Sequence, residues 1–184
     1  MVSENGDLPL VAATRRAADE TGATVIASTG AMTGPQVDSL VETLGYERTI
    51  LCHAVMSYPL ENEAVNMLCL VGLALRYPGV QVGYSGHERG ASNISAASVA
   101  AVAAASFTAR KFGETRIPSM PAVIERHLTL DRSMRGSDHA ASLEPHGFAT
   151  LVRDIRVIES SLGDGVKRVS EIETVAMARL RRAL

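Results

Sequence analysis

Short β-branched, apolar segments alternate with helical segments along this 184-residue chain, and this alternation limits the possible folds more than any other feature. Between the strand-like segments, apolar side chains recur at helical spacing. The strand-like segments are apolar through their whole length, as expected when both faces of a parallel sheet are covered. The pattern therefore predicts an α/β fold made of successive parallel βα units.

The predicted strands are Thr24–Ser28, Thr49–His53, Val80–Ser85 and Ala122–His127. The predicted helices are Leu8–Glu20, Pro35–Leu44, Asn62–Arg76, Ser92–Ala105 and Pro145–Leu162, with a final helix or connector at Ser170–Leu184. About four βα units over residues 1–169 suggest part of a (β/α)8 TIM barrel, which needs eight strands and typically about 250 residues in full. A small open α/β sheet would show the same periodicity.

Polar or ionisable side chains stand at the carboxyl end of each predicted strand, where (β/α)8 barrels carry their chemistry. They are Ser28, His53, Ser85 with His87, and Glu125 with His127. Side chains two residues apart share one face of a strand, and neighbouring strands lie about 4.8 Å apart, so His87 and His127 can converge. Two imidazoles near a carboxylate would suit a divalent transition metal. The spacing fits equally well with histidines that only hydrogen-bond their surroundings.

Two other segments carry groups that could bind a substrate. Ser28, Thr29 and Gly30 lead from a strand into a helix, where hydroxyls and backbone N–H groups can hold a phosphate or carboxylate, or simply cap the helix. Asp138 lies in a glycine-containing loop and could bind sugar hydroxyls or stabilise a turn. We expect His53 to be a core or supporting histidine and His146 to be exposed.

The segment Ser106–Pro121 interrupts the alternation, because helix-to-strand connections usually have roughly 2–6 residues. It contains Arg110, Lys111 and Arg116, which could form a basic binding loop. A surface insertion is the simpler interpretation, and we favour it.

Charge and cysteine content narrow the range of partners and compartments. A formal net charge of -2 gives no electrostatic reason to expect nucleic acid or a membrane surface as a partner. Cys52 and Cys69 lack metal-binding or redox spacing and are expected to be reduced thiols. The N-terminal residues lack the pattern of a signal peptide, so we expect a cytoplasmic protein.

Four segments, taken in order, resemble the strand-end motifs of the sialic acid synthases: VIASTGAMT, ILCHAVMSYP, VGYSGHERG and VIERHLTLDRSMRGSDHAASLEP. The last segment is long and specific, and it argues against an unrelated metal-dependent aldolase barrel. The resemblance covers nearly the whole chain apart from Ser106–Pro121. The family includes enzymes that make N-acetylneuraminate, legionaminate and pseudaminate.

The resemblance implies a (β/α)8 barrel that condenses phosphoenolpyruvate with the open-chain aldehyde of N-acetylmannosamine or a relative and releases phosphate. It also implies a divalent metal cofactor, Mn²⁺ or Mg²⁺. Carried over motif by motif, the metal ligands would be His87 and His127, Ser28 and Ser85 would contact phosphoenolpyruvate, Glu125 would place the reacting groups or the attacking water, and Tyr58 and Asp138 would face the amino sugar.

The chain also departs from the pattern of the family. It begins where the family is in its fourth helix, so the lysines that grip phosphoenolpyruvate are expected to be missing, as is the small antifreeze-like domain. Met56 stands where the family usually has a small polar residue, and Arg126 points away from Glu125 and His127. Two hypotheses follow: a synthase, active alone or completed by a homodimer or a complementing half-barrel chain, or a non-catalytic remnant or half-barrel assembly module.

Overall fold

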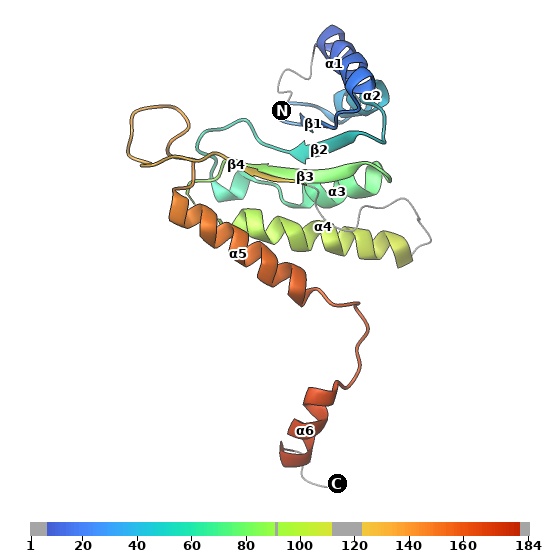
Figure 1. Ribbon diagram of the computed structural model, residues 1–184, viewed down its shortest axis with the longest axis vertical. Coiled ribbons are helices and arrows are strands. Elements are labelled where there is room, and N and C mark those ends of the chain that lie inside the picture. The colour runs from blue at the N-terminus through green and yellow to red at the C-terminus, as the bar shows by residue number, and fades with distance from the viewer. Residues whose placement is uncertain (1–6, 91, 112–122, 181–184) are drawn as a thin grey trace.

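The computed structural model describes residues 7–90, 92–111 and 123–180, and its centre is a sheet of four parallel strands (Figure 1). The strands are β1 (Val25–Ser28), β2 (Thr49–His53), β3 (Gln81–Gly86) and β4 (Ile124–Arg126). They pair in the order β1-β2-β3-β4, each parallel to the next. The predicted α/β fold of successive parallel units is confirmed.

Helices connect the strands and pack against the sheet and one another. They are α1 (Leu8–Thr21), α2 (Gly34–Leu44), α3 (Leu68–Arg76), α4 (Asn93–Lys111), α5 (Pro145–Ser161) and α6 (Glu171–Leu180), with a short 3₁₀ helix, η1 (Asn62–Ala64). Helix α1 packs on α2, and α4 packs on both α3 and α5. Figure 1 shows α6 standing away from the sheet at the end of an extended stretch. Within the described residues, no helix combines the length and the apolarity that crossing a membrane requires.

Local signals explain where the helices begin and end. Asp7 caps α1 by accepting a hydrogen bond from the Leu10 N–H, and Gly22 closes that helix in the left-handed conformation. A capping box of Thr33 and Gln36 begins α2, and a proline stands in the first turn of α1, α2 and α5. These residues are typical signals of helix ends, so several helix boundaries can be predicted from the sequence.

Two of the predicted helices differ from the structure. The predicted helix Asn62–Arg76 is wrong in its first part, because η1 ends at Ala64 and α3 begins only at Leu68. Asn66 lies between them with φ 51°, a left-handed conformation that a continuous right-handed helix excludes. The predicted helix Ser92–Ala105 continues to Lys111, so the first part of Ser106–Pro121 is helical. The remainder of that segment, including Arg116, lies outside the described residues.

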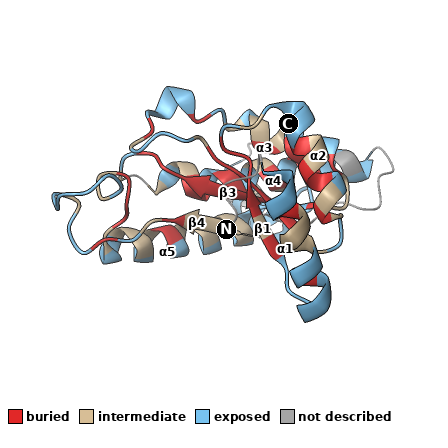
Figure 2. Ribbon diagram, turned by 90° about the horizontal axis from the view of Figure 1, so that it is seen from above, coloured by how far each residue is buried: buried red, intermediate tan, exposed pale blue. Residues whose placement is uncertain are grey.

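Alternation along the strands separates a helix-covered face of the sheet from the face that carries the polar groups. Tyr84 on β3 belongs to the main core, which also includes Leu51, Leu70 and Val102. Figure 2 shows buried residues along β3 and on the inward sides of the surrounding helices. Ser85 lies between Tyr84 and Gly86, so its side chain points to the opposite face. Ser85 and its register partner Glu125 therefore point away from the helices, whereas His53, which pairs with Tyr84, faces them.

Candidate functional site

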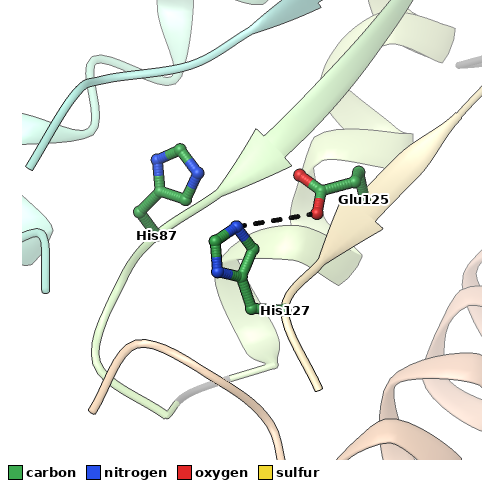
Figure 3. Close-up of side chains that lie close together, drawn as sticks. All are labelled: His87, Glu125 and His127. Atoms are coloured by element: carbon green, nitrogen blue, oxygen red, sulfur yellow. Dashed lines mark ion pairs between the residues drawn. The ribbon is translucent and has the colours of Figure 1, made fainter. Parts of the chain in front are cut away.

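His87, Glu125 and His127 lie together at the carboxyl ends of β3 and β4 (Figure 3). One potential ligand atom from each lies within 4.8 Å of those from the other two. Nε2 of His127 is 3.9 Å from Oε1 of Glu125, and the ring centroids of the two histidines are 5.3 Å apart. Two imidazole nitrogens and a carboxylate oxygen form a donor set that fits a divalent transition metal.

The register of the sheet brings these residues together. Ser85 on β3 pairs with Glu125 on β4. His87 comes two residues after Ser85, and His127 comes two residues after Glu125. Residues two apart share a face, so the two histidines leave the sheet on the same side. The same alternation directs Arg126 to the face that carries the helices.

His87 is held in a defined orientation. Its Nδ1 is 2.8 Å from the carbonyl oxygen of Val55 and, because a carbonyl can only accept, this nitrogen carries the proton. Nε2 is then left with a lone pair on the side of the site, 3.4 Å from the Ser85 hydroxyl. Burial lowers the pKa of His87, and this effect is opposed by the Val55 hydrogen bond and by the nearby carboxylates of Glu125 and Glu88. A neutral imidazole is the form that binds a metal.

Glu125 is oriented by its partner on the neighbouring strand. The Ser85 hydroxyl donates a 2.6 Å hydrogen bond to Oε2 of Glu125, while Oε1 lies on the side of His127. The sequence predicts that Glu125 places the reacting groups or the attacking water. Its position beside both histidines makes it a possible third metal ligand as well.

Tyr58 and Asp138 also lie against the histidines. The ring centroid of Tyr58 is 4.2 Å from that of His87 and 5.9 Å from that of His127. An oxygen of Asp138 is 3.5 Å from Nδ1 of His127. Burial raises the pKa of the Tyr58 hydroxyl, and the charges of Asp138 and Glu125 raise it further, so the hydroxyl stays protonated.

Ser28 lies apart from this group, at the end of β1. It pairs with Cys52 on β2, so β2 separates Ser28 from β3. Two strand spacings amount to about 10 Å across the sheet. The Ser28 hydroxyl oxygen accepts a 3.2 Å hydrogen bond from the Gly30 N–H, in keeping with a turn.

Two further positions from the sequence analysis lie next to Ser28 along the strand ends. His53 is buried, with Nε2 2.7 Å from the carbonyl oxygen of Val65, which agrees with the expected core role. Met56 is exposed, and its side chain approaches Gly30 closely enough that a Cβ there would be 3.0 Å from Cγ of Met56. His146 is exposed at the start of α5, as expected.

Sequence reasoning missed a buried ion pair behind the site. Glu88 and Arg126 are in contact with both side chains fully buried, on the helix-covered side of the strand ends. A glutamate after a strand is usually exposed, and nothing in the pattern marked Glu88 as buried.

A cysteine lies on the polar face below the site. Cys52 is fully buried and neighbours Gly83 in the sheet, two residues before Ser85. Burial raises the pKa of its thiol to about 12, and the negative charge of Glu125 adds to this effect. Both Cys52 and Cys69 are free thiols, in agreement with the sequence analysis.

Residues 4–167 match the model of the NeuB family. The chain is 38% identical over 128 residues to the human N-acetylneuraminate-9-phosphate synthase, a match that covers 70% of this chain and 30% of the human protein. It is 33% identical over 165 residues to the N,N'-diacetyllegionaminic acid synthase of Campylobacter jejuni, covering 87% of this chain and 43% of that enzyme. The chain thus spans less than half the length of these relatives.

A solved structure supports the fold. The N-acetylneuraminic acid synthetase of Leptospira borgpetersenii, in complex with citrate, superposes with a TM-score of 0.69 at 28% sequence identity. The superposition covers 97% of this chain and 57% of that one. The four parallel strands and their helices therefore form a partial barrel of the type found in sialic acid synthases, as the sequence predicted.

Proposed function

This chain belongs to the NeuB family, and on that premise we propose that it supplies the metal-binding half of a synthase that condenses phosphoenolpyruvate with an N-acylated amino sugar, giving a nonulosonic acid and phosphate. The observation that carries the proposal is the convergence of His87, Glu125 and His127. The relatives are sialic acid synthase-type transferases, which gives the site its chemical context.

The proposed metal is Mn²⁺ or Mg²⁺, held by His87 and His127 with Glu125 in reach as a third ligand. When bound, it would supply Lewis-acid polarisation of the aldehyde oxygen of the amino sugar, so that the aldehyde carbon is a better target for the enol carbon of phosphoenolpyruvate. His87 is prepared for this role by its Val55 hydrogen bond, which fixes the ring and leaves Nε2 available.

The remaining site residues have proposed roles in binding and orientation. Tyr58 and Asp138 flank His127 from outside the sheet, and we assign them to the hydroxyl and acylamino groups of the sugar. Glu125, oriented by Ser85, can accept a proton from the water that adds to the carbon bearing the phosphate. Ser85 and Ser28 are assigned to phosphoenolpyruvate, with Ser28 reaching it from β1 at the far side of the strand ends.

The described strands do not contain a cation that faces the site. Arg126 is the one arginine or lysine within the described strands, and it is paired with Glu88 on the helix side. A phosphate with an added carboxylate requires cationic partners. We therefore propose that the anion is gripped by groups beyond those in β1 to β4, and a complementing half-barrel chain or a second copy is the partner that would bring them.

The alternative function is a half-barrel assembly module without catalysis. The observation in its favour is the same lack of a site-facing cation, together with the two strands, β1 and β4, that stand at the edges of the described sheet. In either case we propose a cytoplasmic protein, with residues 1–169 as a partial barrel domain that has an insertion at 106–121, and residues 170–184 as a C-terminal helix or connector.

Phosphate release in the presence of phosphoenolpyruvate, N-acetylmannosamine and Mn²⁺ tests the proposal. We expect no measurable release from the 184-residue chain alone, and release when it is mixed with a separately expressed first half of a NeuB-family barrel. The same mixture made with His127→Ala should be inactive. Metal binding without turnover in any mixture would favour the assembly module. Turnover by the lone chain would show that its own cationic residues bind phosphoenolpyruvate.

A further inference from the structure

A buried ion pair connects the residues adjacent to both candidate metal ligands. Glu88 directly follows His87, and Arg126 directly precedes His127. Nη1 of Arg126 is 2.5 Å from Oε1 of Glu88, and neither side chain is exposed to solvent. Two residues that are 38 positions apart in the chain are thereby joined immediately behind the site.

The guanidinium group holds three segments, not two. In addition to the Glu88 carboxylate, Nη2 of Arg126 donates to the backbone carbonyls of Glu88 and Ala141, each at 2.9 Å. Ala141 lies in the loop after β4 that carries Asp138. A single side chain therefore fixes the end of β3, the end of β4 and the loop that places a carboxylate against His127.

The Glu88 carboxylate is itself held on both oxygens. The Tyr84 hydroxyl donates to Oε2 and the Ser95 hydroxyl donates to Oε1, each at 2.9 Å. Tyr84 comes from β3 and Ser95 from α4, so the carboxylate is anchored to the sheet and to the helix layer. A carboxylate with this many partners cannot move without breaking several hydrogen bonds at once.

A buried ion pair is by itself weak support for stability, because removing both charges from water offsets much of their attraction. The position of this pair suggests a different role. Consecutive Cα atoms are about 3.8 Å apart, so a shift of Glu88 or Arg126 moves the adjacent histidine by a similar amount. A metal or catalytic site tolerates only about 0.5 Å of such movement.

We propose that Arg126 and Glu88 are positioning residues, which set the separation of His87 and His127 and, through the Ala141 carbonyl, the place of Asp138. The inference rests on the proposed function in that it takes the two histidines as metal ligands. It assigns a role to residues that touch neither the metal nor a substrate.

Arg126→Lys is the informative substitution, because lysine keeps the positive charge and loses the forked pair of donors. Val41→Ala is the matched control: Val41 is buried in α2, away from the strand ends, and its truncation destabilises the fold without touching the pair. Two quantities are measured in the full chain. One is Mn²⁺ affinity, and the other is the set of histidine side-chain nitrogen NMR signals of the metal-free protein.

We expect Arg126→Lys to weaken Mn²⁺ binding roughly 10–100-fold, as loss of groups that support metal ligands does. The imidazole signals of His87 and His127 should shift or broaden, while those of the exposed His146 stay unchanged. Val41→Ala should lower the unfolding temperature and leave both readouts as in the wild type. If Arg126→Lys fails to fold, Ser95→Ala removes one donor to Glu88 more gently, and it should produce smaller changes of the same kind.

The outcomes separate this inference from the proposed function. Wild-type affinity and wild-type imidazole signals in a folded Arg126→Lys or Ser95→Ala variant would overturn the positioning role. If the wild-type chain binds no Mn²⁺, the proposed metal role fails, and the imidazole signals alone then decide whether the pair positions the histidines. Equal changes in Val41→Ala would reduce the role of the pair to general stability and would also overturn the inference.

Discussion

The Ser85 hydroxyl donates a 2.6 Å hydrogen bond to Glu125 across the β3–β4 pair, so the carboxylate that reaches the two histidines is oriented by the neighbouring strand. A hydrogen bond to a charged group contributes about 1.5–3 kcal/mol, and its loss leaves a half-buried carboxylate with one partner fewer. The orientation of Glu125 therefore depends on a residue that need not contact the metal.

Ser85→Ala should weaken Mn²⁺ binding roughly 10–100-fold, because the Glu125 carboxylate loses its fixed orientation. Ser106→Ala is the matched control, since Ser106 is an equally buried serine whose hydroxyl donates to the Val102 carbonyl within α4. Isothermal titration of Mn²⁺ into both variants distinguishes them. Unchanged affinity in Ser85→Ala would show that this hydrogen bond does not prepare Glu125 for metal binding.

His127→Ala should reduce Mn²⁺ affinity by more than the roughly 10–100-fold that loss of a supporting contact causes, since a ligand itself is removed. His146 provides the control, because its side chain is 84% exposed at the start of α5. Manganese electron paramagnetic resonance counts the free ion directly. Equal affinity of His127→Ala and His146→Ala would exclude His127 as a ligand.

Gly83→Ala should destabilise the protein by about 1–3 kcal/mol through overpacking. A Cβ at Gly83 would lie 2.6 Å from the Val123 carbonyl oxygen and 2.8 Å from Sγ of Cys52, and the backbone on the β4 side would have to move. Among the described residues, no atom beyond the adjoining turns of α3 lies within 4 Å of a Cβ added at Gly72, so Gly72→Ala should instead stabilise the protein by roughly 0.5–1 kcal/mol. Urea unfolding of the two variants should give opposite signs, and destabilisation by both would contradict the packing at Gly83.

Asp38→Asn should remove a stabilisation that depends on pH. The Arg76 and Tyr77 side chains donate to Asp38 and lower the pKa of its carboxyl group from 3.8 to about 2. Because the folded-state pKa is depressed, the contribution is complete above pH 4 and is lost as the pH falls toward 2. The difference in unfolding temperature between wild type and Asp38→Asn should be largest at neutral pH. It should shrink to near zero as the pH falls from about 4 to about 2.

Asp19→Asn serves as the control for this profile, because Asp19 pairs with Arg15 within one helix on the surface, while Asp38 joins α2 to the end of α3. Such surface pairs contribute little. If the difference in unfolding temperature between wild type and Asp38→Asn is unchanged at pH 2, the substitution lowers stability through packing and not through the lost charge.

The sheet and the grouping of the histidines could be predicted because each depends on a short-range rule. Strand and helix periodicities gave the parallel units, and the two-residue alternation placed His87 with Ser85 and His127 with Glu125. Those rules needed only one assumption about tertiary structure, that the third and fourth strands are neighbours, and the sheet order has them so.

The features that were missed depend on tertiary contacts. A helical pattern over Asn62–Arg76 does not reveal that Asn66 adopts a left-handed conformation, because apolar spacing continues across the break. Burial of Glu88 follows from Arg126, Tyr84 and Ser95 meeting it from two strands and a helix. No local sequence pattern encodes these tertiary contacts. The residues that support the site are therefore harder to predict from the sequence than the residues that form it.

The buried thiol of Cys52 has a consequence for how the site withstands oxidants. Peroxides react with the thiolate, and a thiol whose pKa is raised to about 12 contains almost none of it at neutral pH. A protonated sulfur also offers no thiolate to compete for soft ions such as Zn²⁺. The candidate metal site therefore lies beside a protonated thiol of low reactivity, and oxidation of this protein should begin at exposed sulfur atoms such as those of Met56 and Met134, not at Cys52.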